Sequence, residues 1–391
     1  MTPAPRLDVD ALVDDRETRI IVCCGSGGVG KTTTAAALAL RAAERGRSVV
    51  VLTIDPARRL AQSMGIAALD NTPRPVLGLR HSEEYGEGKL AATMLDMKST
   101  FDEVVVSQAS PEKARLILDN PFYIALSSSF AGTQEYMAME KLGQLHAQAG
   151  AAGIYDLIVV DTPPSRSALD FLDAPERLSS FLDGRFIRLL MAPARGPARL
   201  LTSGLGVVTH ALTTILGSHV LQDMQTFVAA LDTLFGGFRQ RAERTYALLQ
   251  APGTAFVVVA TPERDALDEA AYFLTRLREE HMPLSGVVVN RMTELPSAGV
   301  PASGLTIDQA SAAAADLELD QQEPAGSLAA ALLRLYADRL AYARTQTRTR
   351  DGFIARHPGV PIVSVPALST DIHDLDGLRL IGNLLANPNE E

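Results

Sequence analysis

The sequence predicts an α/β fold, with a doubly wound, mostly parallel sheet and an inserted α-helical subdomain. Three observations lead to this prediction. Apolar runs of strand length alternate with helical patterns along most of the chain. A glycine-rich loop, at 25–30, joins the first of these runs to a helical pattern. Two stretches, at about 98–130 and 177–249, have helical spacing and little strand character, so we assign them to the inserted subdomain.

The composition is that of an acidic globular protein. The 391 residues are 47% hydrophobic and 21% charged, which is enough for a large core in two or three structural units. The 36 Lys and Arg residues against 46 Asp and Glu residues give a net charge of −10. Nucleic acid is therefore not expected as a partner, because contacts to phosphates need a basic face.

The two cysteines are neighbours, Cys23 and Cys24. Adjacent residues of a strand point to opposite faces, so these thiols do not suit a disulfide. Because the sequence has no CxxC pair and no Cys/His cluster, no zinc site is expected. The cysteine usage and the lack of an apolar signal core near the N-terminus predict a cytoplasmic protein.

The first elements are predicted to form a βαβ unit after a polar, acidic N-terminal tail at 1–18. A strand at 19–24 leads through the glycine-rich loop into a helix at 31–44, which Gly46 ends. The next strand occupies 48–54. Such a unit implies parallel strands joined by a right-handed crossover.

The rest of the domain, which extends to 391, continues the alternation of strands and helices. Five more buried strands are expected, at 91–95, 157–160, 255–259, 287–289 and 362–365. Residues 297–326 are predicted to be a loop with one short helix. A helix at 327–350 carries an apolar stripe made of Leu328, Ala331, Leu332, Leu335 and Leu340.

One segment of the helical subdomain, 200–222, contains no charged residue and is long enough to span a membrane as a helix. Its serines, threonines and histidines and its one-sided apolar spacing favour an amphipathic segment instead.

The strongest functional signal is Gly25-x-x-x-x-Gly30-Lys31-Thr32, which lies between a strand and a helix. This pattern in this context indicates a P-loop, in which backbone N–H groups surround phosphate oxygens. Lys31 is expected to reach the β- and γ-phosphates, and the Thr32 hydroxyl to bind Mg²⁺. A tight turn alone would not need Lys31 and Thr32. The expected ATP-binding residues are Gly27, Gly28, Val29, Gly30, Lys31, Thr32 and Thr33.

Two carboxylates follow predicted strands at the edge of the sheet where ligands bind. Asp161 ends the strand at 157–160 and, with Thr32, is the expected ligand of Mg²⁺ or of its water; the alternative is a cap of the next turn. Asp55 ends the second strand and could orient the attacking water. Because Pro56 follows, Asp55 could equally be the N-cap of a helix, and its position alone leaves both roles open.

Taken together, the motifs resemble the ArsA family of P-loop ATPases, which includes arsenite-pump ATPases and the targeting ATPases of tail-anchored membrane proteins. The P-loop is similar to the family's GKGGVGKT, and Asp55-Pro-Ala to its switch I motif, DPAH. The segment from Asp161 to Leu172 is similar to switch II, DTAPTGHTLRFL. Later segments also match: Thr261-Pro-Glu263, Val288-Val-Asn-Arg291 and Val365-Pro-Ala-Leu368.

The resemblance implies roles for several of these residues. Asp55 is expected to be the catalytic carboxylate, acting with Lys31, and Asn290 to contact the adenine with Pro366 beside the base. It also implies an ATPase domain over 19–391 in which two ATP-bound subunits close face to face. Apolar residues of the helical subdomain could line a groove for a hydrophobic or membrane-protein client: Met191, Leu205, Val208, Leu212, Ile215, Leu216, Leu221 and Met224. The same apolar residues could instead form the core of the subdomain or a dimer interface.

One departure from the family pattern concerns the second lysine of its P-loop, which reaches into the partner's site; Ser26 stands here instead. A homodimer is therefore expected to be slow, and a heterodimer with a lysine-bearing paralogue is preferred. Arginines of the switch segments could supply the missing charge, although a solvated helix face is the favoured interpretation of them: Arg58, Arg59 and Arg166. A nearly inactive nucleotide-sensing subunit is the alternative. An arsenite pump is less favoured because thiolate ligands are missing, and a position at the membrane would depend on a partner.

Overall fold

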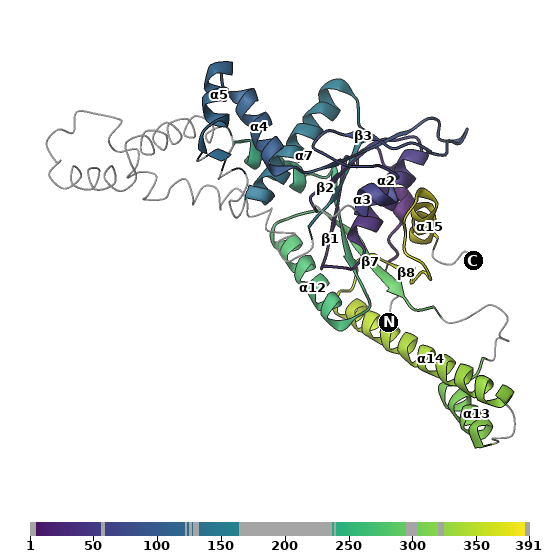
Figure 1. The fold of residues 1–391 in the computed structure, drawn as a ribbon. Coiled ribbons are helices and arrows are strands. Elements are labelled where there is room, and N and C mark those ends of the chain that lie inside the picture. Colours follow the sequence, from purple (N-terminus) through teal and green to yellow (C-terminus); the bar gives the residue numbers. More distant parts are fainter. Residues whose placement is uncertain are drawn as a thin grey trace, which may run out of the picture.

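The structure is a computed structural model. It describes residues 5–55, 59–121, 123–124, 127, 133–163, 237, 240–294, 304–319 and 324–387 (Figure 1). Within this part of the chain, eight strands form one sheet in the order β3-β4-β2-β5-β1-β6-β7-β8. Every neighbouring pair is parallel except β3 and β4. The predicted α/β fold with a doubly wound, mostly parallel sheet is confirmed.

The seven parallel strands coincide with the seven strands expected from the sequence. Their bounds are β1 (Ile20–Cys24), β2 (Ser48–Thr53), β4 (Lys89–Met94), β5 (Leu157–Asp161), β6 (Thr254–Ala260), β7 (Leu284–Met292) and β8 (Ile362–Pro366). The eighth strand, β3 (Arg74–Pro75), was not predicted. Two exposed residues carry no hydrophobic pattern, and only their pairing along the edge of β4 makes them a strand.

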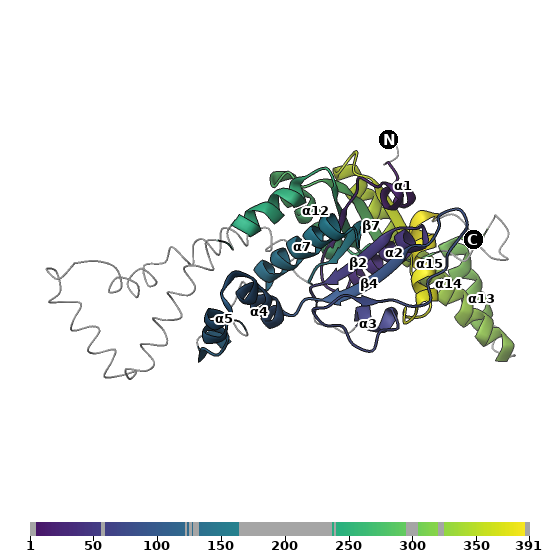
Figure 2. The ribbon, with the colours of Figure 1, turned by 90° about the horizontal axis from the view of Figure 1, so that it is seen from above.

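Helices cover both faces of the sheet (Figure 2). One face holds α1 (Val9–Asp14), α2 (Lys31–Glu44), α3 (Arg59–Ser63) and α15 (Leu375–Ala386), and the other holds α7 (Thr133–Ala152) and α12 (Arg264–Glu279). Alternate strand residues therefore enter different cores: Cys24 packs with α7 and α12, whereas Cys23 packs with α2. Burial on both faces explains why the strands are continuous apolar runs in the sequence.

Helix α2 has the predicted bounds and is the most deeply embedded helix on its face. Its residues from Thr34 to Leu40 are all buried, and most of them are alanines, which let the helix lie close to the sheet. The chain then leaves the helix through Gly46, whose φ of 78° suits a residue without Cβ. The glycine-rich loop is thereby anchored to a rigid element.

The described part of the segment expected to be an N-terminal tail, residues 5–18, packs against the domain. It contains α1, and Val9 and Val13 of this helix are buried against α2. Asp10 accepts hydrogen bonds from Arg41, at 2.9 Å for the Nη2–Oδ2 pair. Two of the acidic residues of this segment, Asp10 and Asp14, are therefore ion-pair partners of arginines at the C-terminal end of α2.

The helical subdomain is only partly within the described residues. Helices α4 (Met97–Gln108) and α5 (Pro111–Leu118) occupy most of 98–130, and residues 240–250 are also helical. Pro111 begins α5, as expected of proline in a first turn. Residues 164–236 lie outside the described part, and with them 200–222 and the predicted client groove, so the domain division stays a prediction. Within the described part, no helix has the length and apolar character to cross a membrane.

Part of the segment 297–326, where a loop with one short helix is expected, belongs to a helical hairpin. Helix α13 (Ile307–Leu319) lies beside α14 (Pro324–Arg356), which is 33 residues long and extends beyond both ends of the predicted helix. The hairpin projects from the sheet on the side opposite to α4 and α5 (Figure 1). The alanine-rich sequence that suggested a loop is the contact surface of α13: Ala310 and Ala314 are fully buried.

The apolar stripe of α14 mostly faces solvent. Ala330 and Ala337 are buried instead, because the two helices of the hairpin pack through small residues. Of the predicted stripe, only Leu340 is buried; Leu328, Leu332 and Leu335 are 56–64% exposed. Helical periodicity reveals an apolar face of this helix, but it does not show which face packs against a partner.

Arg47, just before β2, links the segments that precede β1 and β5, and its substitution tests how much this network stabilises the fold. Its side chain is fully buried and donates to the Asp156 carboxylate at 2.7 Å and to four backbone carbonyls, those of Val13, Asp15, Thr18 and Asp156. We expect Arg47→Met to lower the free energy of unfolding by about 3–5 kcal/mol, because the four carbonyls lose their donor and Asp156 loses its buried partner.

The measurement is urea unfolding followed by circular dichroism. Arg16 is the matched control, because it contacts the same carboxylate at 3.0 Å with a side chain that is 57% exposed. Arg16→Met should cost less than about 1 kcal/mol. Equal unfolding midpoints for the two variants would show that the buried network contributes little.

Candidate active site

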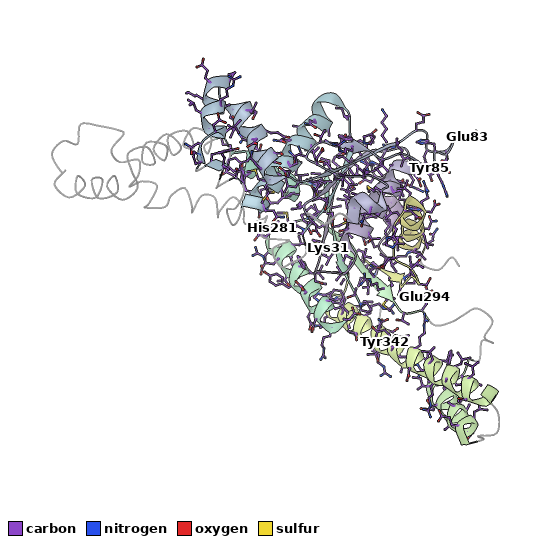
Figure 3. All side chains as sticks on the ribbon, in the orientation of Figure 1. Lys31, Glu83, Tyr85, His281, Glu294 and Tyr342 are labelled. Carbon is purple, nitrogen blue, oxygen red and sulfur yellow. The ribbon has the colours of Figure 1, made fainter. Side chains whose placement is uncertain are left out.

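The glycine-rich loop lies at the centre of the carboxyl edge of the sheet. It follows β1, which is flanked by β5 on one side and β6 on the other. The strands β2, β4 and β5, which follow β1 in the chain, lie on one side of it, and the later strands β6, β7 and β8 lie on the other side. Such a switch point is where parallel α/β sheets bind ligands. Figure 3 shows Lys31 in this central position.

Two glycines of the loop are required by the strands beside it. Gly25 has a φ of 147°, and a Cβ there would overlap the carbonyl group of Val259 in β6. Gly30 is the N-cap of α2 with a φ of 98°, and a Cβ there would overlap the amide nitrogen of Asn290. Between them Gly27 and Gly28 are exposed, so their backbone N–H groups are accessible to an anion at the helix N-terminus.

Lys31 is buried at the first position of α2, and its Nζ donates to the Ser26 carbonyl at 2.7 Å. Burial lowers the pKa of Lys31, while the charges of Asp161 and Asp55 act in the opposite direction. This hydrogen bond uses one of the three N–H donors of the ammonium group. The lysine thus lies across the loop with two N–H donors left, and its contact with phosphate oxygens stays a prediction.

Asp161 is the most constrained side chain of the site. It is fully buried at the end of β5, and its Oδ2 accepts hydrogen bonds from Thr32 at 2.8 Å and Thr53 at 2.9 Å. Burial raises the pKa of Asp161 to about 6, although the two hydroxyl donors and Lys31 favour the charged form. The carboxylate is therefore held in an unfavourable environment by its position at the strand end.

The same residues fit a magnesium ion. Oδ1 of Asp161 is buried and has no hydrogen-bond partner within the described part of the chain. It lies on the carboxylate that holds the Thr32 hydroxyl, so the site presents the hard oxygen donors that Mg²⁺ prefers. Among the described residues, no cluster of three or more His, Cys, Asp or Glu side chains is placed to hold a metal ion.

Thr53 is a site residue that the sequence analysis missed. Its hydroxyl donates to the Asp161 carboxylate and accepts from the backbone N–H of Asp55 at 3.2 Å, so it links the side chain of one predicted site residue to the main chain of the other. A polar residue at the end of a strand of valines and leucines was the available signal. Asp55 is partly buried beside it; residues 56–58, which include Arg58, lie outside the described part, as does Arg166.

Asn290 and Pro366 lie on the neighbouring strands β7 and β8. The Asn290 amide donates through Nδ2 to the Val29 carbonyl of the loop at 2.9 Å, and its Oδ1 accepts from the Arg291 backbone N–H at 2.9 Å. Pro366 is buried at the end of β8, paired with Met292. The structure thus brings Asn290 to the P-loop; the adenine contact of either residue stays a prediction.

Neither thiol is accessible to solvent. Cys23 and Cys24 are free and fully buried. Burial raises the pKa of Cys24 to about 12 and that of Cys23 well above its usual range. Since the thiolate is the form that binds soft metals and metalloids, these residues do not provide an arsenite site.

Comparison with known proteins agrees with this geometry. The model of the anion-transporting ATPase family matches residues 18–299, which is most of the chain. The chain belongs to this family. A relative from Arabidopsis thaliana, ATPase GET3C, is 24% identical over 72% of the chain and 68% of its own length. The ATPase ASNA1 homolog of Cryptosporidium parvum is 28% identical over 70% of the chain and 66% of its own length.

A third relative is a putative arsenical pump-driving ATPase of Halobacterium salinarum, 30% identical over 48% of the chain but only 29% of its own length. The named relatives are ATPases, and this family member is an ATPase too. The matched segments differ in how much of each relative they cover, so clients, partners and transported species do not follow from them.

Asp161 predicts a pH dependence of stability in the absence of magnesium. Its pKa of about 6 exceeds the usual 3.8, so the folded state binds this proton more tightly than the unfolded state does. The resulting stabilisation is complete below pH 3.8 and is lost as the pH rises through 6. We expect Asp161→Asn to raise the melting temperature relative to the wild type, and more at pH 7.5 than at pH 4.5.

The measurement is thermal unfolding in EDTA at both pH values. Taking the difference between variant and wild type at each pH cancels the titration of all other groups. A difference that does not change with pH would mean that the buried carboxylate is not the group responsible.

Proposed function

We propose that this ATPase depends on Mg²⁺ and works as a nucleotide-gated dimeric switch that transmits its nucleotide state to a hydrophobic client or a partner protein. The observation that carries the proposal is the contact of one buried carboxylate, Asp161, with both Thr32 and Thr53. Thr32 belongs to the nucleotide loop and Thr53 to the strand that leads into Asp55. A movement of Thr32 at the phosphate site would therefore be transmitted through Asp161 and Thr53 to the segment after β2.

The chemistry expected of these residues is hydrolysis of ATP to ADP and phosphate. Lys31 and the N-terminus of α2 would neutralise the phosphate oxygens, and Asp55 would orient the attacking water and accept its proton. Thr32 and Asp161 would hold Mg²⁺, which supplies further neutralisation of phosphate charge. Asn290 and Pro366 would flank the base, as the family resemblance implies.

The described contacts offer a route from the nucleotide edge to the helical subdomain. Gln134, near the start of α7, donates to the Ile54 carbonyl next to Asp55 at 3.1 Å. Six residues further along α7, both carboxylate oxygens of Glu140 lie 2.9 Å from Nε of Arg241, in the helix at 240–250, and share its N–H. We propose that movement of Ile54 and Asp55 is carried by α7 to the helices of the subdomain, where a client would bind.

The dimer partner is the second part of the proposal. Ser26 replaces the lysine that the family sends into the partner's site, and this favours a heterodimer with a lysine-bearing paralogue over a homodimer. The same replacement supports the alternative of a nearly inactive nucleotide-sensing subunit. Association with the membrane would then occur through the partner or client.

Ser26→Lys tests the partner proposal. The side chain would restore the missing positive charge, and a group supplied in trans can accelerate phosphoryl transfer by up to about 10³–10⁵. We expect ATP turnover to rise strongly in this variant, together with a nucleotide-dependent homodimer measured by light scattering. Ser26→Met, which has a similar length and no charge, is the control and should stay slow.

The opposite result is equally informative. If the wild type already hydrolyses ATP rapidly and Ser26→Lys changes little, this chain needs no partner lysine, and the heterodimer proposal fails.

Asp55→Asn tests the catalytic assignment. Removing the carboxylate should lower the turnover number by about 10²–10⁴, because the water loses its base, while ATP binding measured by calorimetry is retained. Asp268→Asn, an exposed carboxylate on α12, is the control and should keep full turnover. Unchanged turnover in Asp55→Asn would show that another group positions the water.

A further inference from the structure

We infer that Asn290 is a positioning residue for the phosphate loop, so that it supports binding of the phosphates whether or not a base is attached. The inference deepens the ATPase assignment and depends on it. It rests on contacts of Asn290 with two consecutive residues of the loop, Val29 and Gly30. Recognition of adenine by itself would require neither contact.

The first contact is the hydrogen bond from Nδ2 of Asn290 to the Val29 carbonyl, at 2.9 Å. The Val29 side chain is buried under the loop, whereas Gly27 and Gly28 before it are exposed. A carbonyl held by Asn290 fixes the peptide plane between Val29 and Gly30. The N–H of that plane belongs to Gly30, so its direction is set by the same bond.

The second contact is steric. The Asn290 amide nitrogen occupies the space that a Cβ on Gly30 would take. Gly30 is also the N-cap of α2 and has a left-handed φ of 98°. The glycine and the asparagine are therefore complementary, because the close approach of β7 to the loop needs a residue without a side chain at position 30.

The asparagine is itself held in place by its own strand. Its Oδ1 accepts the backbone N–H of Arg291, which has a φ of 60° where β7 shifts register against β8. This bond orients the amide so that the nitrogen points to the loop. An amide offers two N–H donors and two acceptor lone pairs, so one of each is left over for a base. Loop support and adenine contact are thus compatible in one side chain.

On the other side of the loop, Gly25 lies against the Val259 carbonyl of β6. The loop is therefore held at its beginning by β6 and at its end by β7. Only the second of these attachments is made by a side chain, and only that one can be removed without changing the backbone of the loop.

Asn290→Asp is the sharpest test. Aspartate has nearly the same size and keeps an oxygen for the Arg291 N–H, but it loses the donor to Val29 and places negative charge beside a carbonyl. The ligands are magnesium ATP and magnesium tripolyphosphate, which has phosphates and no base. Binding of both to the wild type, Asn290→Asp and Asn290→Ala is measured by calorimetry, and the folded state of each variant is checked by its melting temperature.

We expect Asn290→Ala to weaken ATP and tripolyphosphate by a similar factor, about three- to tenfold for one lost hydrogen bond, and Asn290→Asp to weaken both further. Gln346→Ala is the matched control. Gln346 has a buried amide whose Oε1 accepts the backbone N–H of Thr293 at 2.7 Å, three residues after Asn290 in the chain. Among the described residues, it forms no hydrogen bond with the loop. It should leave both affinities unchanged.

The proposal is overturned if Asn290→Ala and Asn290→Asp weaken ATP but bind tripolyphosphate as the wild type does, since Asn290 would then act on the base alone. It is also overturned if Gln346→Ala weakens both ligands equally, because any disturbance of the end of β7 would then suffice. A wild type that binds neither ligand would instead contradict the ATPase assignment itself.

Discussion

The position of the Asp161 carboxylate is the constraint on which the nucleotide edge depends. It is fully buried at the end of β5, where ionisation is costly, and it is satisfied on one oxygen by the hydroxyls of Thr32 and Thr53. Those hydroxyls come from the first turn of α2 and the last residue of β2. One side chain therefore determines how the phosphate loop and the segment around Asp55 lie relative to each other.

The other half of the sheet constrains the loop from the opposite side. Gly25 lies against a carbonyl of β6, and Asn290 of β7 reaches the end of the loop. Because β1 is in the middle of the sheet, strands from both halves border the same loop. In a parallel sheet the carboxyl ends of all these strands lie at one edge. Residues as distant in the chain as Gly25 and Asn290 can therefore form one site.

The hairpin of α13 and α14, outside the sheet, is held together by close packing of small side chains. Helix α14 meets α13 through alanines, and three of its leucines, Leu328, Leu332 and Leu335, are left on the outer surface. Alanines allow a short distance between helix axes, so the many backbone and Cβ contacts replace the burial of larger side chains. This outcome depends on which partner helix is available, and periodicity within α14 carries no information about that.

The sequence by itself determined the seven parallel strands, helix α2, the P-loop and the two strand-end carboxylates, because buried strands and a glycine-rich turn leave strong local patterns. It did not determine β3, the packing of residues 5–18 on α2, the outward leucines of α14, or the bridging role of Thr53. Each of these depends on a neighbour that is distant in the chain. Only the tertiary structure decides which surfaces and hydrogen-bonding groups such neighbours present to one another.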